Sequence, residues 1–150
     1  MLRLAWFLLA GALIVSACAE EPDLDLNIQN KQTLTFVFSG RSYASEFEVL
    51  QLQKPTPPNK VNPFSFNGET IWKLSTSRPI KGADWPPIAY GEAPRNFAQT
   101  VPESGMPPKL AEDKLYVARI TGGKDAQTTL FFEMRNGKAV NVSDTLRPSR

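Results

Sequence analysis

The sequence predicts an all-β protein, an antiparallel β-sandwich, and three observations lead to this expectation. From Thr33 onward, apolar and polar residues alternate in short runs, which is the two-residue period of strands. No window of a dozen residues keeps the spacing of a helix. The 13 prolines lie mostly between the apolar runs, and proline removes a ladder donor, so we expect no central paired strand to run through one.

Eight short runs, each bounded by Pro, Gly or Asn, are the expected strands. In chain order they are residues 33–38, 47–53, 69–75, 88–90, 97–101, 114–121, 128–135 and 138–142. The proline-rich stretches 54–63 and 102–108 are expected to be irregular surface connections. Eight short strands in a domain of this size suit an antiparallel sandwich or a small barrel.

The last three runs have the clearest pattern. Gly122-Gly123 and Asn136-Gly137 separate them, and Asn-Gly favours a type I′ hairpin turn because both central positions need a positive φ. We therefore expect a three-stranded meander. Its core side chains are expected to form two sets, Tyr116, Ala118 and Ile120 on one strand and Leu130, Phe132 and Met134 on the next.

The segment before the first of these strands narrows the type of sandwich. Leu110 precedes Tyr116 by six residues, and Tyr116 opens an apolar strand. This segment resembles the tyrosine corner of fibronectin type III and related immunoglobulin-like domains, in which the tyrosine hydroxyl bonds to upstream backbone. The resemblance covers about residues 69–135 and implies an Ig/fibronectin III-like sandwich with Trp72 buried. The Pro-Gly usual between that Leu and Tyr is replaced by two acids, and an ordinary strand aromatic at Tyr116 is the alternative.

Residues 1–17 have the anatomy of a secretory signal peptide. Arg3 lies near the start, an apolar run covers residues 4–15, and the small residues Ser16 and Ala17 follow. The run has 12 residues (15 − 4 + 1). A helix needs roughly 20 apolar residues to span a bilayer, so we expect a cleaved signal and no permanent transmembrane helix.

Val15-Ser16-Ala17-Cys18 resembles the lipobox of bacterial lipoproteins. The resemblance implies that Cys18 is lipidated with two or three acyl chains and becomes the first residue of a 133-residue mature chain (150 − 17). More than one acyl chain makes membrane attachment lasting. Ala19 stands where an aspartate would favour the inner membrane, so the resemblance favours the outer membrane, with the domain facing the periplasm. The inner membrane, the cell surface and a stray thiol at Cys18 are the alternatives.

Residues 18–30 are predicted to be an acidic tether. They hold four acids, Glu20, Glu21, Asp23 and Asp25, and no Lys or Arg. A segment of this composition buries too little apolar surface to fold and stays solvated. The alternation in residues 23–28 leaves a short edge strand or a weak cation site as alternatives. Residues 31–150, the predicted sandwich domain, carry 16 basic (17 − 1) and 11 acidic (15 − 4) side chains.

Composition also bears on chemistry. The chain has no histidine and a single cysteine, so it lacks the usual zinc and copper ligands and any Ser–His or Cys–His pair. We therefore expect no metal, no cofactor and no enzymatic activity. The basic residues are scattered, whereas a nucleic-acid surface needs a dense basic stripe, so no nucleic acid is expected as a partner. A pair of carboxylates that hydrolyses glycosides is the enzymatic alternative.

Trp85 is the candidate for an exposed binding aromatic. It stands between Asp84 and two prolines, and an aromatic ring beside prolines forms a platform for a sugar or a peptide. The alternative is a tryptophan that folds back onto the edge of the core. The predicted ligand-binding group on this irregular stretch is Trp85, Tyr90, Arg95 and Phe97.

These patterns predict a membrane-anchored periplasmic lipoprotein that acts as a non-enzymatic interaction or structural module of the bacterial cell envelope. Its expected partners are the membrane, through the lipid on Cys18, and an envelope protein or a glycan. A carbohydrate- or peptidoglycan-binding module that uses loop aromatics is one alternative function. A carboxylate-based hydrolase is the other.

Overall fold

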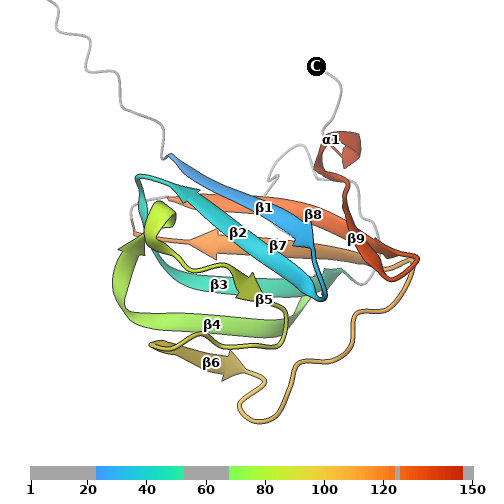
Figure 1. Ribbon diagram of the computed structural model, residues 1–150, viewed down its shortest axis with the longest axis horizontal. Helices are drawn as coiled ribbons and strands as arrows, with labels where there is room; N and C mark the ends of the chain where they lie inside the picture. The colour runs from blue at the N-terminus through green and yellow to red at the C-terminus, as the bar shows by residue number, and fades with distance from the viewer. Residues whose placement is uncertain (1–22, 53–67, 124–125, 147–150) are drawn as a thin grey trace, which may run out of the picture.

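A computed structural model describes residues 23–52, 68–123 and 126–146, and these residues form two packed antiparallel sheets (Figure 1). The smaller sheet has the strand order β1 (Leu24–Asn30), β2 (Leu34–Gly40) and β5 (Ile88–Ala89). The larger sheet has the order β6 (Phe97–Val101), β4 (Gly68–Lys81), β3 (Tyr43–Leu52), β7 (Leu115–Thr121), β8 (Gln127–Arg135) and β9 (Lys138–Asn141). Two short helical turns, η1 (Gly82–Asp84) and α1 (Ser143–Leu146), complete the description.

The predicted all-β antiparallel sandwich is confirmed. All strand pairs within the two sheets are antiparallel. The orders β1-β2-β5 and β3-β7-β8 correspond to the A-B-E and C-F-G orders of immunoglobulin-type sandwiches. Among the described residues, no helix is long and apolar enough to cross a membrane.

Aromatic side chains fill the space between the sheets. Phe36 of β2 meets Phe47 of β3 at a ring-centroid distance of 4.9 Å, and the Phe47 ring stands perpendicular to Trp72 at 5.9 Å. Trp72 is fully buried, as predicted. Both predicted core sets also face inward, with Tyr116, Ala118, Ile120, Leu130 and Phe132 buried and Met134 packed against the cluster.

The predicted meander is formed by β7, β8 and β9. Asn136 and Gly137 connect the last two strands with φ values of 52° and 73°, the pair of positive angles that a type I′ turn requires. Arg135 and Lys138 then pair directly across the hairpin. Local turn chemistry therefore sets the register of the C-terminal strands.

The predicted tether is wrong for its second half, because Leu24–Asn30 is strand β1. The strand pairs with β2 along its whole length, and Leu24 and Leu26 lie in the core. The alternation of apolar and polar residues, on which the alternative of an edge strand was based, explains this. Every second side chain of β1 faces the apolar core, and the acids between them face water. Residues 24–30 therefore belong to the sandwich, ahead of its predicted start at residue 31.

The β1 strand is also fastened to the larger sheet at both ends. The Thr128 hydroxyl donates to the Leu24 carbonyl. At the other end, the Asn30 side-chain amide donates to the Ala139 carbonyl at 2.8 Å and accepts from the Ala139 N–H at 2.8 Å. These contacts join the first strand to β8 and β9 and close one side of the sandwich.

The β4 strand is longer than the predicted run of 69–75 and passes through Pro79, contrary to the expectation that no central paired strand contains a proline. The pairing with β3 explains this. It jumps from Ala44 opposite Ile80 to Glu46 opposite Ser75, so residues 76–79 lie outside the β3 register. Proline is tolerated there because no ladder bond to β3 is needed.

The signal peptide, the lipobox with Cys18 and the irregular connection at 54–63 are predictions that lie outside the described residues.

The strands of the two sheets run between two ends of the sandwich. At the β2–β3 end, β1, β3 and β8 begin and β2, β4 and β7 finish, on the left of Figure 1. At the opposite, β8–β9 end, the β1–β2 and β8–β9 turns lie together. The chain enters the fold at the β2–β3 end.

Candidate functional site

A groove of about 610 Å³ opens at the β8–β9 end. It lies between the β1–β2 turn, the segment after β5, the segment that leads into β7, and the β8–β9 hairpin. Its lining residues are Thr33, Leu34, Tyr90, Lys109, Leu110, Ala111, Glu112, Met134 and Gly137. Four parts of the chain that are distant in sequence thus form one surface.

The groove combines an apolar floor with a charged rim. Leu34, Leu110 and Met134 are half-buried and pack against the main core. Lys109 and Glu112 are exposed at its edge. The Glu112 carboxylate accepts a hydrogen bond from the Gly137 N–H at 2.7 Å, so this acid also ties the wall of the groove to the β8–β9 turn.

Tyr90 connects the groove to the core. Its ring stands edge-on to Trp72 at 5.1 Å, and its hydroxyl donates to the Pro108 carbonyl at 2.8 Å. Burial, with a smaller contribution from Tyr116, raises the pKa of Tyr90 well above its ordinary value. The phenol therefore keeps its proton and acts as a hydrogen-bond donor at physiological pH.

The wall formed by residues 108–113 is held by the predicted tyrosine corner. The Tyr116 hydroxyl accepts a hydrogen bond from the Ala111 N–H at 2.8 Å, which confirms that this hydroxyl ties back to upstream backbone. The Asp113 N–H donates to the Met134 carbonyl at 3.2 Å, and Asp113 has a φ of 56°. One wall is therefore fixed to β7 and β8 before any ligand binds.

The expectation that Trp85 is exposed is wrong. Only 4% of its surface is accessible. Its ring packs against Phe38 at 5.1 Å and Phe97 at 5.0 Å, and its indole N–H donates to the Ile80 carbonyl at 3.2 Å. Burying the large indole while satisfying its N–H is favourable, so the ring fills the edge of the core and presents no platform to solvent.

The other predicted ligand-binding residues divide between two places. Phe97 packs with Trp85 at the core edge. Arg95 is exposed in the turn before β6, outside the groove lining. Tyr90 lines the groove. The structure therefore brings Trp85 and Phe97 together at the core edge, and of the four predicted residues Tyr90 is the one that lines the groove.

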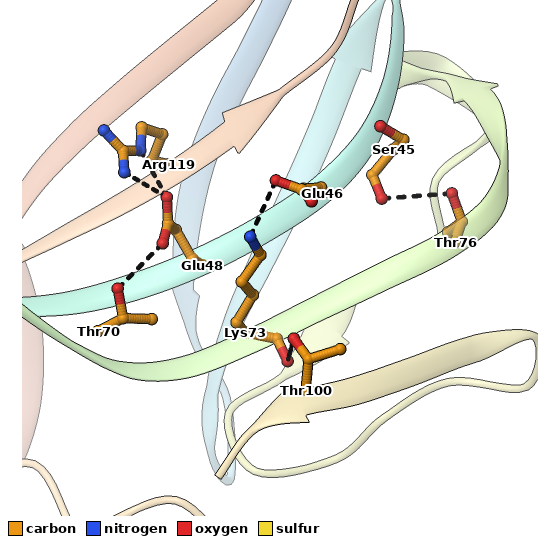
Figure 2. Close-up of polar contacts among 8 residues, drawn as sticks. All are labelled: Ser45, Glu46, Glu48, Thr70, Lys73, Thr76, Thr100 and Arg119. Carbon is orange, nitrogen blue, oxygen red and sulfur yellow. Dashed lines mark hydrogen bonds and ion pairs between the residues drawn. The ribbon is translucent and has the colours of Figure 1, made fainter. Parts of the chain in front are cut away.

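A second polar feature lies on the face of the larger sheet that points away from the core (Figure 2). Glu48 on β3 accepts hydrogen bonds from the Arg119 guanidinium of β7, including one from Nε at 2.7 Å, and from the Thr70 hydroxyl of β4 at 3.1 Å. Two residues away, Glu46 pairs with Lys73 at 3.0 Å. Both carboxylates are therefore held by a neighbouring cation.

The contacts drawn in Figure 2 join β3, β4, β6 and β7. The Thr76 hydroxyl of β4 donates to the Ser45 carbonyl of β3 at 3.4 Å, and the Thr100 hydroxyl of β6 lies 3.5 Å from the Lys73 carbonyl. Cross-strand pairs of this kind stabilise a sheet. We therefore assign this polar cluster the structural role of stabilising the larger sheet.

Sequence reasoning missed most of the groove. Leu34, Leu110 and Met134 have the apolar character of ordinary core residues, and nothing in their spacing reveals that they face one hollow.

Within the described ranges, no group of three or more His, Cys, Asp or Glu side chains is arranged to hold a metal ion. The chain matches no protein-family model, no curated protein and no solved structure.

Proposed function

We propose that this protein is a lipid-anchored, non-enzymatic interaction module of the bacterial envelope, attached to the outer membrane and facing the periplasm. The observation that carries the proposal is the position of the groove, at the end of the sandwich opposite the start of β1. A chain anchored through its N-terminus would turn this groove away from the bilayer. A partner would then find it accessible.

The short link between the predicted anchor and the fold supports this orientation. Cys18 precedes Asp23 by five positions (23 − 18). Five residues fully extended span at most about 18 Å. A lipid on Cys18 would hold the β2–β3 end beside the membrane and raise the effective concentration of the groove near other envelope components.

The chemistry of the groove favours a protein partner. Leu34, Leu110 and Met134 offer an apolar floor, and methionine adapts its shape to different apolar groups. Lys109 and Glu112 at the rim can set the orientation of a polypeptide through charge. We propose that an apolar side chain in an extended segment of an envelope protein occupies it.

The two alternative functions, glycan binding and carboxylate-based hydrolysis, have no comparable structural observation in their favour. Glycan binding was predicted from an exposed Trp85, and that ring is buried. A hydrolase needs two carboxylates about the scissile bond, and Glu112 is the one acid among the lining residues of the groove.

The anchor is tested by radioactive palmitate labelling in cells that express either the wild-type chain or Cys18→Ser. We expect label and outer-membrane fractionation for the wild type, and loss of both for the variant. Ser16→Thr is a control that keeps the thiol. Equal labelling of Cys18→Ser and the wild type would overturn the anchor.

The groove is tested by photo-crosslinking in living cells. A benzoylphenylalanine replaces Ala111 in the groove wall or, as a matched control, the exposed Ser39 at the opposite end. We expect a discrete adduct with an envelope protein from position 111 that is weakened by Met134→Lys. Thermal unfolding verifies that this variant folds, and Leu110→Arg serves if it does not. Equal adducts from both positions, or none, would contradict the proposal.

A further inference from the structure

An exposed aromatic and two basic side chains gather at the β2–β3 end, where the chain enters the fold. Tyr43 is the first residue of β3, and 53% of its surface is accessible. Lys81, the last residue of β4, pairs with Tyr43 across the ladder, and its ammonium lies 5.8 Å from the centre of the Tyr43 ring. Arg41 in the adjoining turn is largely exposed.

This cluster is fixed to the point where the described chain begins. The Ser42 N–H donates to the Asp23 carbonyl at 2.9 Å, and the Gly82 N–H donates to the Ser42 carbonyl at 2.9 Å. The approach at Gly40 is so close that a Cβ there would lie 2.2 Å from the Asp23 carbonyl oxygen, and its φ is 109°. The Ser42 hydrogen bond therefore holds Asp23 beside the turn that carries Arg41 and Tyr43.

We propose that Tyr43 and Lys81 form a membrane-contact patch that rests on phospholipid headgroups. This inference rests on the proposed lipid anchor, because the link of at most about 18 Å brings the β2–β3 end to the bilayer surface. Tyrosine is favoured at headgroup depth because its ring is apolar and its hydroxyl is wet. The Lys81 ammonium, which lies 5.8 Å from the centre of the Tyr43 ring, meets lipid phosphate in this arrangement.

Local charge indicates which lipids the patch accepts. Arg41 is paired with Asp23 at 3.0 Å, and Asp84 in η1 lies three positions after Lys81. The two basic and two acidic side chains, those of Arg41, Lys81, Asp23 and Asp84, sum to zero formal charge. The patch therefore binds the phosphate that every phospholipid headgroup carries and does not require a net negative bilayer. We therefore expect contact with zwitterionic as well as anionic bilayers, with little dependence on salt.

The test uses the lipidated full-length chain in vesicles of phosphatidylethanolamine and phosphatidylglycerol. Because the acylated Cys18 has no free thiol, an engineered cysteine is the only labelling site in the chain. A fluorophore is placed at Ala83→Cys, in η1 beside the patch, or at Met106→Cys as the control. Met106 is 76% exposed and follows β6 on the way to the other end.

A spin-labelled headgroup lipid then reports contact by quenching. We expect the label at position 83 to lose about half of its fluorescence, because the patch lies at headgroup depth, and the label at position 106 to be unaffected. Tyr43→Ser combined with Lys81→Ser should abolish the quenching at 83, whereas the control Lys138→Ser at the far end should leave it unchanged.

The outcomes separate this inference from the anchor on which it rests. A mass spectrum without the diacylglyceryl group on Cys18 overturns the proposed function and this inference with it. A lipidated chain whose label at 83 is unquenched overturns the patch alone. Quenching that persists in the Tyr43→Ser, Lys81→Ser variant also overturns the patch, because it shows that the short link accounts for the proximity.

Discussion

The Tyr116 hydroxyl links the groove to the core of the domain. The side chain is fully buried, its ring stacks on Phe132 at 5.4 Å, and its oxygen satisfies the Ala111 N–H. Leu110 and Ala111 line the groove. The shape of the groove wall therefore depends on one hydrogen bond made by a core residue.

Tyr116→Phe should lower the free energy of unfolding by about 1–2 kcal/mol, because the Ala111 N–H loses its acceptor while the ring still fills its place. Urea unfolding measures the loss. Tyr43→Phe is the matched control, since that ring is exposed, and it should stay within about 0.5 kcal/mol of the wild type. Equal stability of Tyr116→Phe and the wild type would show that the corner does not hold the wall.

The Glu48–Arg119 pair gives a second prediction at this scale. Its side chains are 11% and 24% exposed, so Arg119→Leu leaves a shielded carboxylate without its cation. We expect a loss of about 2–3 kcal/mol in the free energy of unfolding. The double variant Glu48→Leu, Arg119→Leu should recover part of it, because replacing both charges by apolar groups removes the unpaired one.

The control for this cycle is the more exposed pair of Glu133 and Arg135, whose side chains are 30% and 54% exposed. Water screens this pair, so its coupling energy should be about 0.5 kcal/mol or less. Urea unfolding of the four chains in each cycle gives both values. If the two couplings are equal, burial does not strengthen the Glu48–Arg119 contact.

Single residues also show where sequence reasoning fails. Trp85 stands between an acid and two prolines, a loop composition that gives no sign of burial. Its ring is nevertheless enclosed by Phe38 and Phe97, which are 47 and 12 positions away (85 − 38 and 97 − 85). A loop side chain is buried by tertiary partners, and local composition does not reveal them.

At the scale of elements, alternation and turn chemistry predict strands well. Seven of the eight predicted runs differ from the observed strands by no more than four residues at either end, and β6 has the predicted bounds. The exception is β4, which extends six residues further (81 − 75). The reason is non-local, because a register jump against β3 frees the stretch that contains Pro79.

The β1 strand shows the opposite difficulty. Its sequence holds both signals, an acidic composition and a two-residue alternation, and composition alone favours a tether. Pairing with β2 and burial of Leu24 and Leu26 stabilise these residues as a strand and not as a solvated tether. The groove could not be predicted for a related reason, since its floor is assembled from segments that meet only in the folded chain.

At the scale of the whole molecule, the domain boundary is testable by truncation. A chain that begins at residue 31 loses β1, whereas one that begins at residue 23 keeps it. Losing the burial of Leu24 and Leu26 alone should cost at least about 4 kcal/mol, a large part of the 5–15 kcal/mol that typically stabilises a domain.

We therefore expect the chain from residue 31 to lack a cooperative thermal transition and the chain from residue 23 to keep it. Calorimetry and circular dichroism of the two chains provide the measurement. Equal melting temperatures would restore the interpretation of residues 24–30 as a tether.

The two ends of the molecule differ in their proposed contacts, a difference that amino-acid composition does not reveal. Its two proposed contacts lie at opposite ends, with Tyr43 and Lys81 at the β2–β3 end and the groove at the β8–β9 end. A rigid sandwich between them keeps their separation constant. A ligand in the groove would therefore stand at a fixed height above the surface on which the patch rests.

The fastening of β1 also determines when the fold can close during synthesis. The partners of its two ends, Thr128 and Ala139, lie 104 and 109 positions further along the chain. A ribosome delivers β1 and its neighbour β2 early and these partners near the end, so the bonds from β1 to the larger sheet form only after nearly the entire chain has been made. A polypeptide whose translation stops before β9 lacks the two Asn30–Ala139 hydrogen bonds, and we expect proteases to cleave its β1 strand more readily than that of the full-length chain.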